Sequence, residues 1–399
     1  MDLRLSIISH QALSTLGGVP IHIRQLVEAM VKLGVDVEVI APAYSEVADF
    51  SSYPFKLTPI LVGSRLQTMR TLEYSYKVYK YLLENRRTFD AVHGSQWSNL
   101  FIAIHKQEHK LPIITKMHGT TFYLLRSALR YKPPRVFDDI GWFAISPVYF
   151  HFEHIILKKS HGIICISRAV KNEAVSLIGK SEQNRFTVIY NGVNHKRFRP
   201  LRKTREFGQH MKLGEGNKCV LYVGRLEPMK GLHYLVISMR KLLKAFPKLK
   251  LVIVGDVGEH PRYTHYLHKL IGSMKNVIFL GKVPHRYLPV IYNIGDVCVI
   301  PSFYEALGNV ALEAMACGKP IIASAVGGLK ELIRHCETGF LLNPSYMREE
   351  LIKYLSILLS NDKLARSMGR KAREFVIKNF DWMKTAMQTV NFISKLISQ

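Results

Sequence analysis

The chain has 399 residues, of which 48% are hydrophobic and 22% charged, and this balance excludes an intrinsically disordered protein. Its 56 Lys and Arg residues outnumber 30 Asp and Glu residues, so the formal net charge is +26. Such a surplus indicates anionic partners, and nucleic acid, an anionic membrane face and phosphorylated small molecules all fit it. At about 100–200 residues per domain, the length predicts two or three domains.

The cysteines and the apolar runs indicate where the protein works. Five cysteines lie far apart without a C-x-x-C pair, so we expect buried free thiols in a reducing compartment. Residues 1–8 resemble a first strand more than a signal peptide. The longest uncharged aromatic stretch, 141–152, is shorter than the roughly 20 residues that span a bilayer. These features predict a cytoplasmic protein, with peripheral attachment at the inner membrane face left open.

Short β-branched runs alternate with helical patterns in the first half of the chain. Leu3–Ser9 and Val35–Ile40 are predicted strands, and Ile21–Leu33 between them has apolar residues at helical spacing. This βαβ pattern favours a parallel sheet covered by helices on both faces. Further strands are predicted at 91–93, 112–117, 162–166 and 186–190.

The alternation stops and then restarts, which predicts a second domain. Residues 194–217 are polar and basic and are typical of a linker. Beyond them, strands are predicted at 219–223, 249–254, 277–280, 297–301 and 320–324, and helices at 232–245, 263–274 and 309–316. The expected fold class is therefore α/β, with two doubly wound domains at 1–195 and 196–379 and a cleft between them. The amphipathic tail 380–399 is expected to pack back on the first domain.

Two carboxylates stand eight residues apart near the predicted helix at 309–316. Glu305 ends a loop after a strand, Gly308-Asn309 opens the helix, and Glu313 lies about one turn further along it. Such a loop presents backbone N–H groups and the positive end of the helix dipole to a phosphate. The carboxylates could then bind hydroxyl groups on either side. The spacing alone fits equally well with carboxylates that favour the helix start or face water.

Two cations follow the first strand of the second domain. Arg225 leaves this strand, and Lys230 comes just before the next helix. The carboxyl ends of strands in open α/β sheets bind ligands, and two cations beside a helix N-terminus suit a diphosphate. Taken alone, an Arg and a Lys in a loop are more often solvated.

These motifs together resemble those of retaining GT-B glycosyltransferases of family four, the glycogen-synthase-like and sucrose-synthase-like group. The resemblance extends over nearly the whole chain, and the joint order and spacing of its motifs make it specific. The motifs are Gly17-Gly18, Met117-His118-Gly119-Thr120, Ile189–Asn194, Gly224-Arg225, Lys230-Gly231, Tyr292–Val297, Pro301-Ser302, Glu305 with Glu313, and Gly327-Gly328.

The resemblance implies a GT-B architecture and roles for the matched residues. Arg225 and Lys230 are expected to neutralise the diphosphate of a nucleotide sugar, Glu305 to hold a hydroxyl of the donor sugar, and His118 to lie beside that sugar. Without Gly119 and the preceding strand, an ordinary loop histidine, one of 17, would be the better interpretation of His118. The expected donor-binding residues are Gly17, Gly18, Gly224, Leu307, Gly308, Asn309 and Glu313, with Glu313 on the ribose hydroxyls.

The resemblance also implies the reaction. A hexosyl group passes from a UDP- or GDP-sugar to a hydroxyl of a glycan, a lipid-linked or a small-molecule acceptor, with retention of configuration. In similar enzymes the leaving phosphate is pictured as helping to deprotonate the acceptor, and no general base is obvious in this sequence. The chain has no Asp-x-Asp metal motif, so neither a metal nor another cofactor is expected.

The segment 110–152 is basic and aromatic. Its part 110–136 has six Lys and Arg residues and no acid, interleaved with apolar residues. Such a surface could lie on an anionic membrane and reach a lipid-linked acceptor. A helical pair with core aromatics and solvated charges explains the segment equally simply.

Three other functions compete. A GT-B epimerase that acts on a sugar nucleotide without an acceptor is the nearest alternative. A nucleic-acid-binding protein fits the charge of +26, but no zinc finger or RNP signature is present, so no nucleic-acid partner is expected. A nicotinamide dehydrogenase would need G-x-G-x-x-G after a first strand, and neither domain has it.

Overall fold

In the computed structural model the chain forms two parallel sheets covered by helices. The structure describes residues 3–13, 18–44, 53–64, 66–131, 140–201, 217–256 and 260–398. The strands of the first sheet are β1 (Arg4–Ile8), β2 (Asp36–Ala43), β3 (Lys56–Leu61), β4 (Ala91–Ser95), β5 (Ile113–Met117), β6 (Gly162–Cys165) and β7 (Phe186–Val188). Those of the second are β8 (Cys219–Val223), β9 (Lys250–Val254), β10 (Val277–Gly281), β11 (Val297–Ile300), β12 (Ile321–Ser324) and β13 (Gly339–Leu342).

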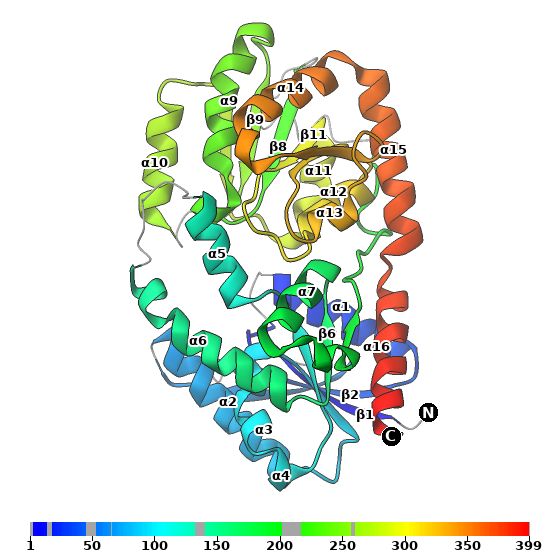
Figure 1. The fold of residues 1–399 in the computed structure, drawn as a ribbon. Coiled ribbons are helices and arrows are strands. Elements are labelled where there is room, and N and C mark those ends of the chain that lie inside the picture. Colours follow the sequence, from blue (N-terminus) through cyan, green and yellow to red (C-terminus); the bar gives the residue numbers. More distant parts are fainter. Residues whose placement is uncertain are drawn as a thin grey trace. The chain divides into compact units, whose positions relative to one another are not determined.

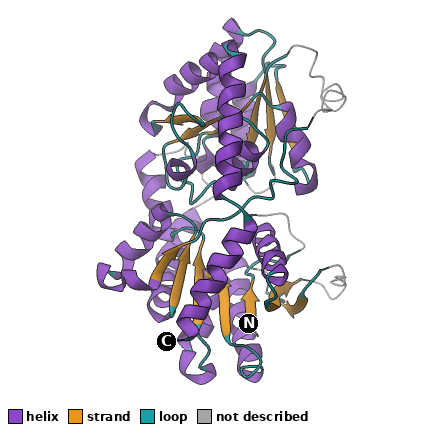
Figure 2. Ribbon diagram, turned by 90° about the vertical axis from the view of Figure 1, so that its right-hand side faces the viewer, coloured by secondary structure: helices purple, strands orange, loops and turns teal. Residues whose placement is uncertain are grey.

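The helices fall between the strands, as βαβ units require. Those of the first half are α1 (Gly18–Lys32), α2 (Gln67–Glu84), α3 (Leu100–Ile104), α4 (Lys106–His109), α5 (Thr121–Tyr131), α6 (Ile140–Lys159) and α7 (Arg168–Ile178). Those of the second half are α9 (Leu232–Ala245), α10 (Pro261–Ile271), α11 (Leu288–Ile294), α12 (Asn309–Ala316), α13 (Leu329–Leu332), α14 (Met347–Ser360), α15 (Asp362–Asn379) and α16 (Trp382–Ile397). Helices flank each sheet (Figure 2).

Contacts divide the chain into two compact units. Unit 1 comprises residues 1–123, 145–192 and 382–399, and unit 2 comprises residues 124–144 and 193–381. The predicted linker lies largely outside the described residues, because 202–216 are not described.

Each sheet is doubly wound. The strand order is β3-β2-β1-β4-β5-β6-β7 in unit 1 and β10-β9-β8-β11-β12-β13 in unit 2, with every pairing parallel. The predicted α/β class with two doubly wound domains is confirmed. In both sheets the strand order reverses beside the first strand of the unit, where this fold class binds ligands.

Apolar packing of helices holds both sheets in place. In unit 1, the inner faces of α1 and α16 pack against β1 and β2, and α16 lies beside α1 (Figure 1). In unit 2, β8, β9 and β11 form one core with α9, α10 and α14. The strands are buried on both sides because their sequences are nearly continuous apolar runs.

Candidate functional site

The candidate site of unit 2 lies where its strand order reverses. β8 pairs directly with β11, so the loops 224–231 and 301–308 leave the sheet side by side at its carboxyl edge. Gly231 ends the first loop with φ +67°, and a Cβ there would lie 1.9 Å from the carbonyl oxygen of Pro301. The two loops therefore touch at a position that only glycine fits.

Lys230 and Glu305 meet across these loops. The Lys230 Nζ lies 2.8 Å from Glu305 Oε2, and the two side chains are only 19% and 20% exposed. The Ser302 hydroxyl donates to the same carboxylate oxygen over 3.4 Å. The structure thus joins a predicted cation and a predicted carboxylate that are 75 residues apart in the chain. An anion bound to Lys230 would share this ammonium group with Glu305.

Arg225 and Gly224 lie at the start of the first loop. The Arg225 side chain is 59% exposed and contacts Glu227 at 3.0 Å, so its guanidinium faces solvent. Gly224, with φ +158°, donates its N–H to the carbonyl of Val254 and holds the loop on the end of β9. Glu227 was missed as a site residue, although it lies between Arg225 and Lys230 in the sequence.

The second loop leads into α12 as predicted. Gly308 has φ +108° and is the N-cap of α12, Asn309 is its first residue, and Leu307 is buried behind the loop. The N-terminus of this helix and Glu305 therefore stand on one loop, and Lys230 reaches Glu305 from the neighbouring loop. A helix N-terminus with a neighbouring cation suits a phosphate group.

Glu313 is held by two side chains that the sequence analysis did not connect with it. His285 Nε2 lies 2.7 Å from Glu313 Oε1, and the Tyr292 hydroxyl donates to Oε2 over 2.8 Å. Burial, together with the adjacent carboxylate, raises the pKa of Tyr292 well above its usual value. Nothing in the sequence marks His285, which lies 28 residues before its partner.

Of the residues predicted for unit 1, His118 follows β5 directly. It is half-buried, and its N–H donates to Gln96 Oε1 over 3.3 Å. Gly18 begins α1, whereas Gly17 lies outside the described residues. His118 and Gly18 belong to unit 1, and the other described candidates belong to unit 2.

A buried basic cluster surrounds His118 and was missed. It comprises His22 on α1, His93 on β4 and Lys116 on β5, each at most 3% exposed. No described residue provides a hydrogen-bond partner for Lys116 Nζ, His22 Nδ1 or His93 Nδ1. Lys116 itself is a partial signal, because a lysine interrupts the apolar run of the predicted strand 112–117.

Burial lowers the pKa values of this cluster, and for the histidines nearby basic groups lower them further. Burial lowers the pKa of Lys116 to about 7. The pKa of His118 lies well below its usual value because of burial and then because of Lys116, His10 and His93. Burial and Lys116 lower the pKa of His93 to about 3. A neutral His118 has one donor and one acceptor nitrogen, which matches a sugar hydroxyl.

The interpretation of 110–136 as one basic surface is wrong in part. Lys116 points into the core of unit 1 and is 2% exposed. Lys110 precedes β5 and Arg126 follows it on α5, so the strand separates them. Lys132 and Arg135 lie outside the described residues. Of the exposed described cations, Arg126 and Arg130 share α5 with exposed Phe122 and Leu129.

The remaining expectations concern the cysteines, a metal site and a membrane-spanning helix. Cys165, Cys219, Cys298 and Cys317 are buried free thiols as expected, whereas Cys336 is exposed, contrary to that expectation. Across the described ranges, no group of three or more His, Cys, Asp or Glu side chains is placed to hold a metal ion. No helix within those ranges is long and apolar enough to cross a membrane.

Two doubly wound units with a phosphate-compatible site at a strand-order reversal define an α/β protein of the GT-B class. Comparison with known proteins assigns the family: the chain belongs to the group 1, family four glycosyltransferases. Residues 204–375 match the family Glycosyl transferases group 1, and residues 16–197 match Glycosyltransferase Family 4. The predicted resemblance is thereby confirmed, and the protein is a glycosyltransferase.

Individual relatives agree with this assignment. An uncharacterized glycosyltransferase of Methanocaldococcus jannaschii, MJ1607, is 30% identical over 94% of this chain and 93% of its own. The sucrose-phosphate synthase of Thermosynechococcus elongatus superposes with a TM-score of 0.85 at 24% identity over the whole of both chains. HepE of Anabaena in complex with UDP-glucose gives a TM-score of 0.77 at 20% identity, over 98% of this chain and 99% of that chain. The epimerase and nucleic-acid-binding alternatives gain no support.

Proposed function

We propose that the protein is a retaining glycosyltransferase that moves a hexosyl group from a UDP- or GDP-sugar to an acceptor hydroxyl. The observation that carries this proposal is the half-buried Lys230–Glu305 pair beside the N-terminus of α12. It offers a cation for a diphosphate and a carboxylate for a sugar hydroxyl within one loop cluster. The UDP-glucose complex of HepE, which shares the fold, supports a nucleotide-sugar donor.

The proposed step breaks the bond between the anomeric carbon and the diphosphate oxygen, and the electron pair leaves with that oxygen. The acceptor oxygen bonds to the same face of the sugar, and its proton passes to the departing phosphate. Charge grows on the phosphate in the transition state, so fixed cations there give the main stabilisation. Lys230 and Arg225 supply these cations, and we expect that no metal or other cofactor is required.

The carboxylates have distinct proposed roles. Glu305 binds a donor-sugar hydroxyl and keeps Lys230 aimed at the loop. Glu313 binds the ribose hydroxyls through lone pairs that His285 and Tyr292 leave available, since each carboxylate oxygen accepts more than one hydrogen bond. His285 and Tyr292 thus hold Glu313 in place before the nucleotide binds.

The proposed acceptor surface involves α5 and α6. The exposed rings of Phe122 and Phe150 lie 6.0 Å apart between centroids, and Arg126 and Arg130 follow on α5. Exposed aromatics with nearby arginines suit the interface of an anionic membrane, so we propose peripheral contact and a lipid-linked acceptor. A glycan or a small-molecule acceptor is the alternative outcome of the experiment below.

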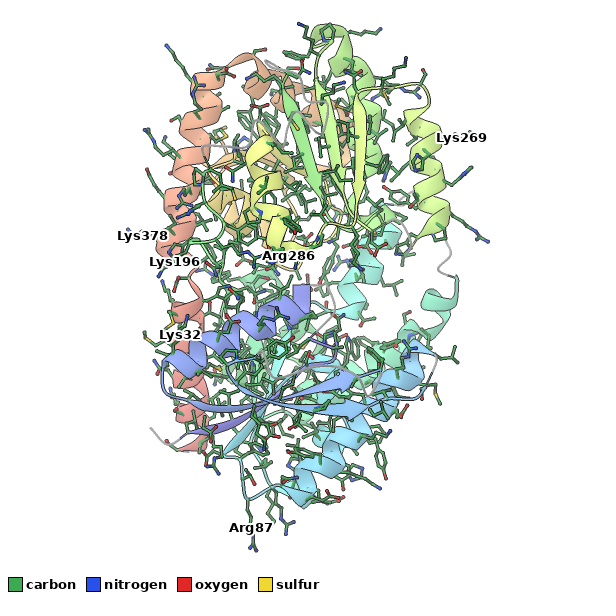
Figure 3. All side chains as sticks on the ribbon, turned by 180° about the vertical axis from the view of Figure 1, so that it is seen from behind. Lys32, Arg87, Lys196, Lys269, Arg286 and Lys378 are labelled. Atoms are coloured by element: carbon green, nitrogen blue, oxygen red, sulfur yellow. The ribbon has the colours of Figure 1, made fainter. Side chains whose placement is uncertain are left out.

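A donor and acceptor screen tests the proposal. UDP-, GDP- and ADP-sugars are compared by thermal shift and product analysis, with and without a lipid extract. We expect stabilisation by one nucleotide class, and a loss of transfer of about 100-fold or more in Lys230→Ala and Glu305→Ala. The control is Lys269→Ala, which changes an exposed lysine on α10 (Figure 3). Failure of every nucleotide sugar to bind, or full activity in both site variants, would reject the proposal.

A further inference from the structure

A row of contacting rings connects the C-terminal helix to His118. The His22 ring of α1 meets the His118 ring edge-on, with centroids 5.3 Å apart and planes at 76°. The same ring also contacts the ring of Trp382, the first residue of α16, with centroids 5.2 Å apart and planes at 51°. His22 is therefore held between a candidate site residue and the end of a helix more than 250 positions further along the chain.

Hydrogen bonds of residues just before and just after Trp382 hold the Trp382 end of this row of rings. Just before it, the N–H of Val193 donates to the carbonyl of Phe380 over 2.9 Å. Just after it, the Thr385 hydroxyl donates to the carbonyl of Tyr190, also over 2.9 Å. Trp382 directly follows Asp381, where the chain passes from unit 2 into unit 1. The indole thus has little freedom to shift, and it gives His22 a fixed wall.

A purely structural role explains His22 poorly. Its ring is 2% exposed, and no described residue offers a hydrogen-bond partner to its Nδ1. An unsatisfied buried polar atom costs stability, so an apolar side chain would fill this position more cheaply. Burial, and after it Lys116, His118 and His93, lower the pKa of His22 well below its usual value, so the ring is neutral. A planar, neutral ring is suited to fixing the plane of a neighbouring imidazole.

We propose that His22 and Trp382 are positioning residues that set the orientation of the His118 imidazole toward the donor sugar. This inference rests on the proposed function, because it presumes that His118 contacts the donor. Edge-to-face ring contacts prefer one relative orientation, so the two contacts together restrict the rotation of His118. Neither His22 nor Trp382 needs to touch substrate.

Four variants test this role. We expect His22→Leu and Trp382→Leu to reduce kcat/KM for transfer by up to about tenfold, since each removes one ring contact. His22→Phe and Trp382→Phe retain a ring, and we expect them to restore most of the activity. The matched control is Phe392→Leu, which removes an aromatic ring further along α16 that packs beside Gly162. We expect this control to transfer sugar like the wild type.

A double-mutant cycle separates positioning from general stability. In a His118→Ala background, His22→Leu should cost nothing further in kcat/KM, because the ring that it positions is gone. An equal loss in both backgrounds would overturn the inference, and so would wild-type activity of His22→Leu and Trp382→Leu. Lys230→Ala tests the proposed function independently: if it loses transfer while the two leucine variants do not, the positioning role alone fails.

Discussion

At the scale of single residues, Lys116 is the least expected side chain of the protein. Its amine lies inside unit 1 without a described hydrogen-bond partner, among imidazoles rather than carboxylates. Burial disfavours the charged form and lowers the pKa of this amine to about 7. The unfolded chain keeps the ordinary pKa near 10.4. Between these two values the unfolded state binds a proton that the folded state does not.

Lys116→Met should therefore stabilise the protein. Methionine has a similar length and no charge to desolvate, so we expect the free energy of unfolding at pH 7 to rise by about 2–4 kcal/mol. Stability from this group increases with pH between the folded and unfolded pKa values, because unfolding takes up a proton there. The advantage of the variant should then shrink from pH 7 to pH 9.5. Denaturant titrations of both proteins across this range measure it.

The control for this prediction is Lys158→Met, which changes an exposed lysine near the end of α6. Surface substitutions of this kind shift stability by about 0.5 kcal/mol or less. The prediction fails if Lys116→Met is less stable than the wild type, or if the difference in their free energies of unfolding does not depend on pH. Either result would show that an anion pairs with the Lys116 amine and keeps it charged. Because Lys116 also lies beneath His118, the activity of the variant bears on the site and is a separate measurement.

At the scale of elements, the sequence predicts every interior strand of the two sheets but only two of their four edge strands. The apolar run 219–223 became the interior strand β8, and 277–280 became the edge strand β10 within one residue. β3 was missed because it is an edge strand with a partly exposed pattern that contains Pro59. β13 was missed because it is four residues long at the other edge of its sheet.

The candidate site, too, was predicted from the sequence only in part. Arg225, Lys230, Glu305 and Gly308 come from loops that directly follow predicted strands, so the topology of a doubly wound sheet brings them to one edge. Helices and strands that are distant in sequence supply the partners of Glu313 and the ring that contacts His118. No local pattern encodes such contacts, and they are visible only in three dimensions.

Gly231 in the first site loop and Gly281 at the end of β10 allow the effect of backbone strain to be compared with that of steric overlap. Gly231 and Gly281 have nearly equal φ angles, +67° and +65°. A Cβ at Gly231 would overlap the carbonyl oxygen of Pro301, whereas at Gly281 it would meet no atom within 4 Å. Gly281→Ala should therefore cost only the left-handed backbone penalty of about 1 kcal/mol. Gly231→Ala should cost clearly more, and it should also displace Lys230 and reduce transfer.

Chemical denaturation and transfer assays on these two alanine variants check the prediction. Equal losses of stability would mean that the loops 224–231 and 301–308 adjust without cost, which would remove the argument that they are locked together. Wild-type transfer by Gly231→Ala would show that Lys230 does not depend on this contact.

At the scale of the whole molecule, the net charge of +26 is widely distributed. Basic side chains such as Lys32, Arg87, Lys196, Lys269, Arg286 and Lys378 extend outward from both units (Figure 3). A dispersed charge attracts any polyanion weakly, whereas a membrane-binding surface needs cations beside exposed apolar groups. The described part of α5 provides both, with Arg126 and Arg130 near the exposed ring of Phe122.

Vesicle binding distinguishes a local surface from overall charge. Two arginines at about 1 kcal/mol each should favour vesicles that contain phosphatidylglycerol over pure phosphatidylcholine by roughly 30-fold, and high salt should remove the difference. Arg126→Gln with Arg130→Gln should abolish most of this preference. Lys269→Gln with Arg286→Gln lowers the net charge equally, from +26 to +24, but on exposed residues outside α5, and should leave it intact. If co-sedimentation falls equally for both double variants, the attraction belongs to the whole molecule and the proposed membrane face on α5 is wrong.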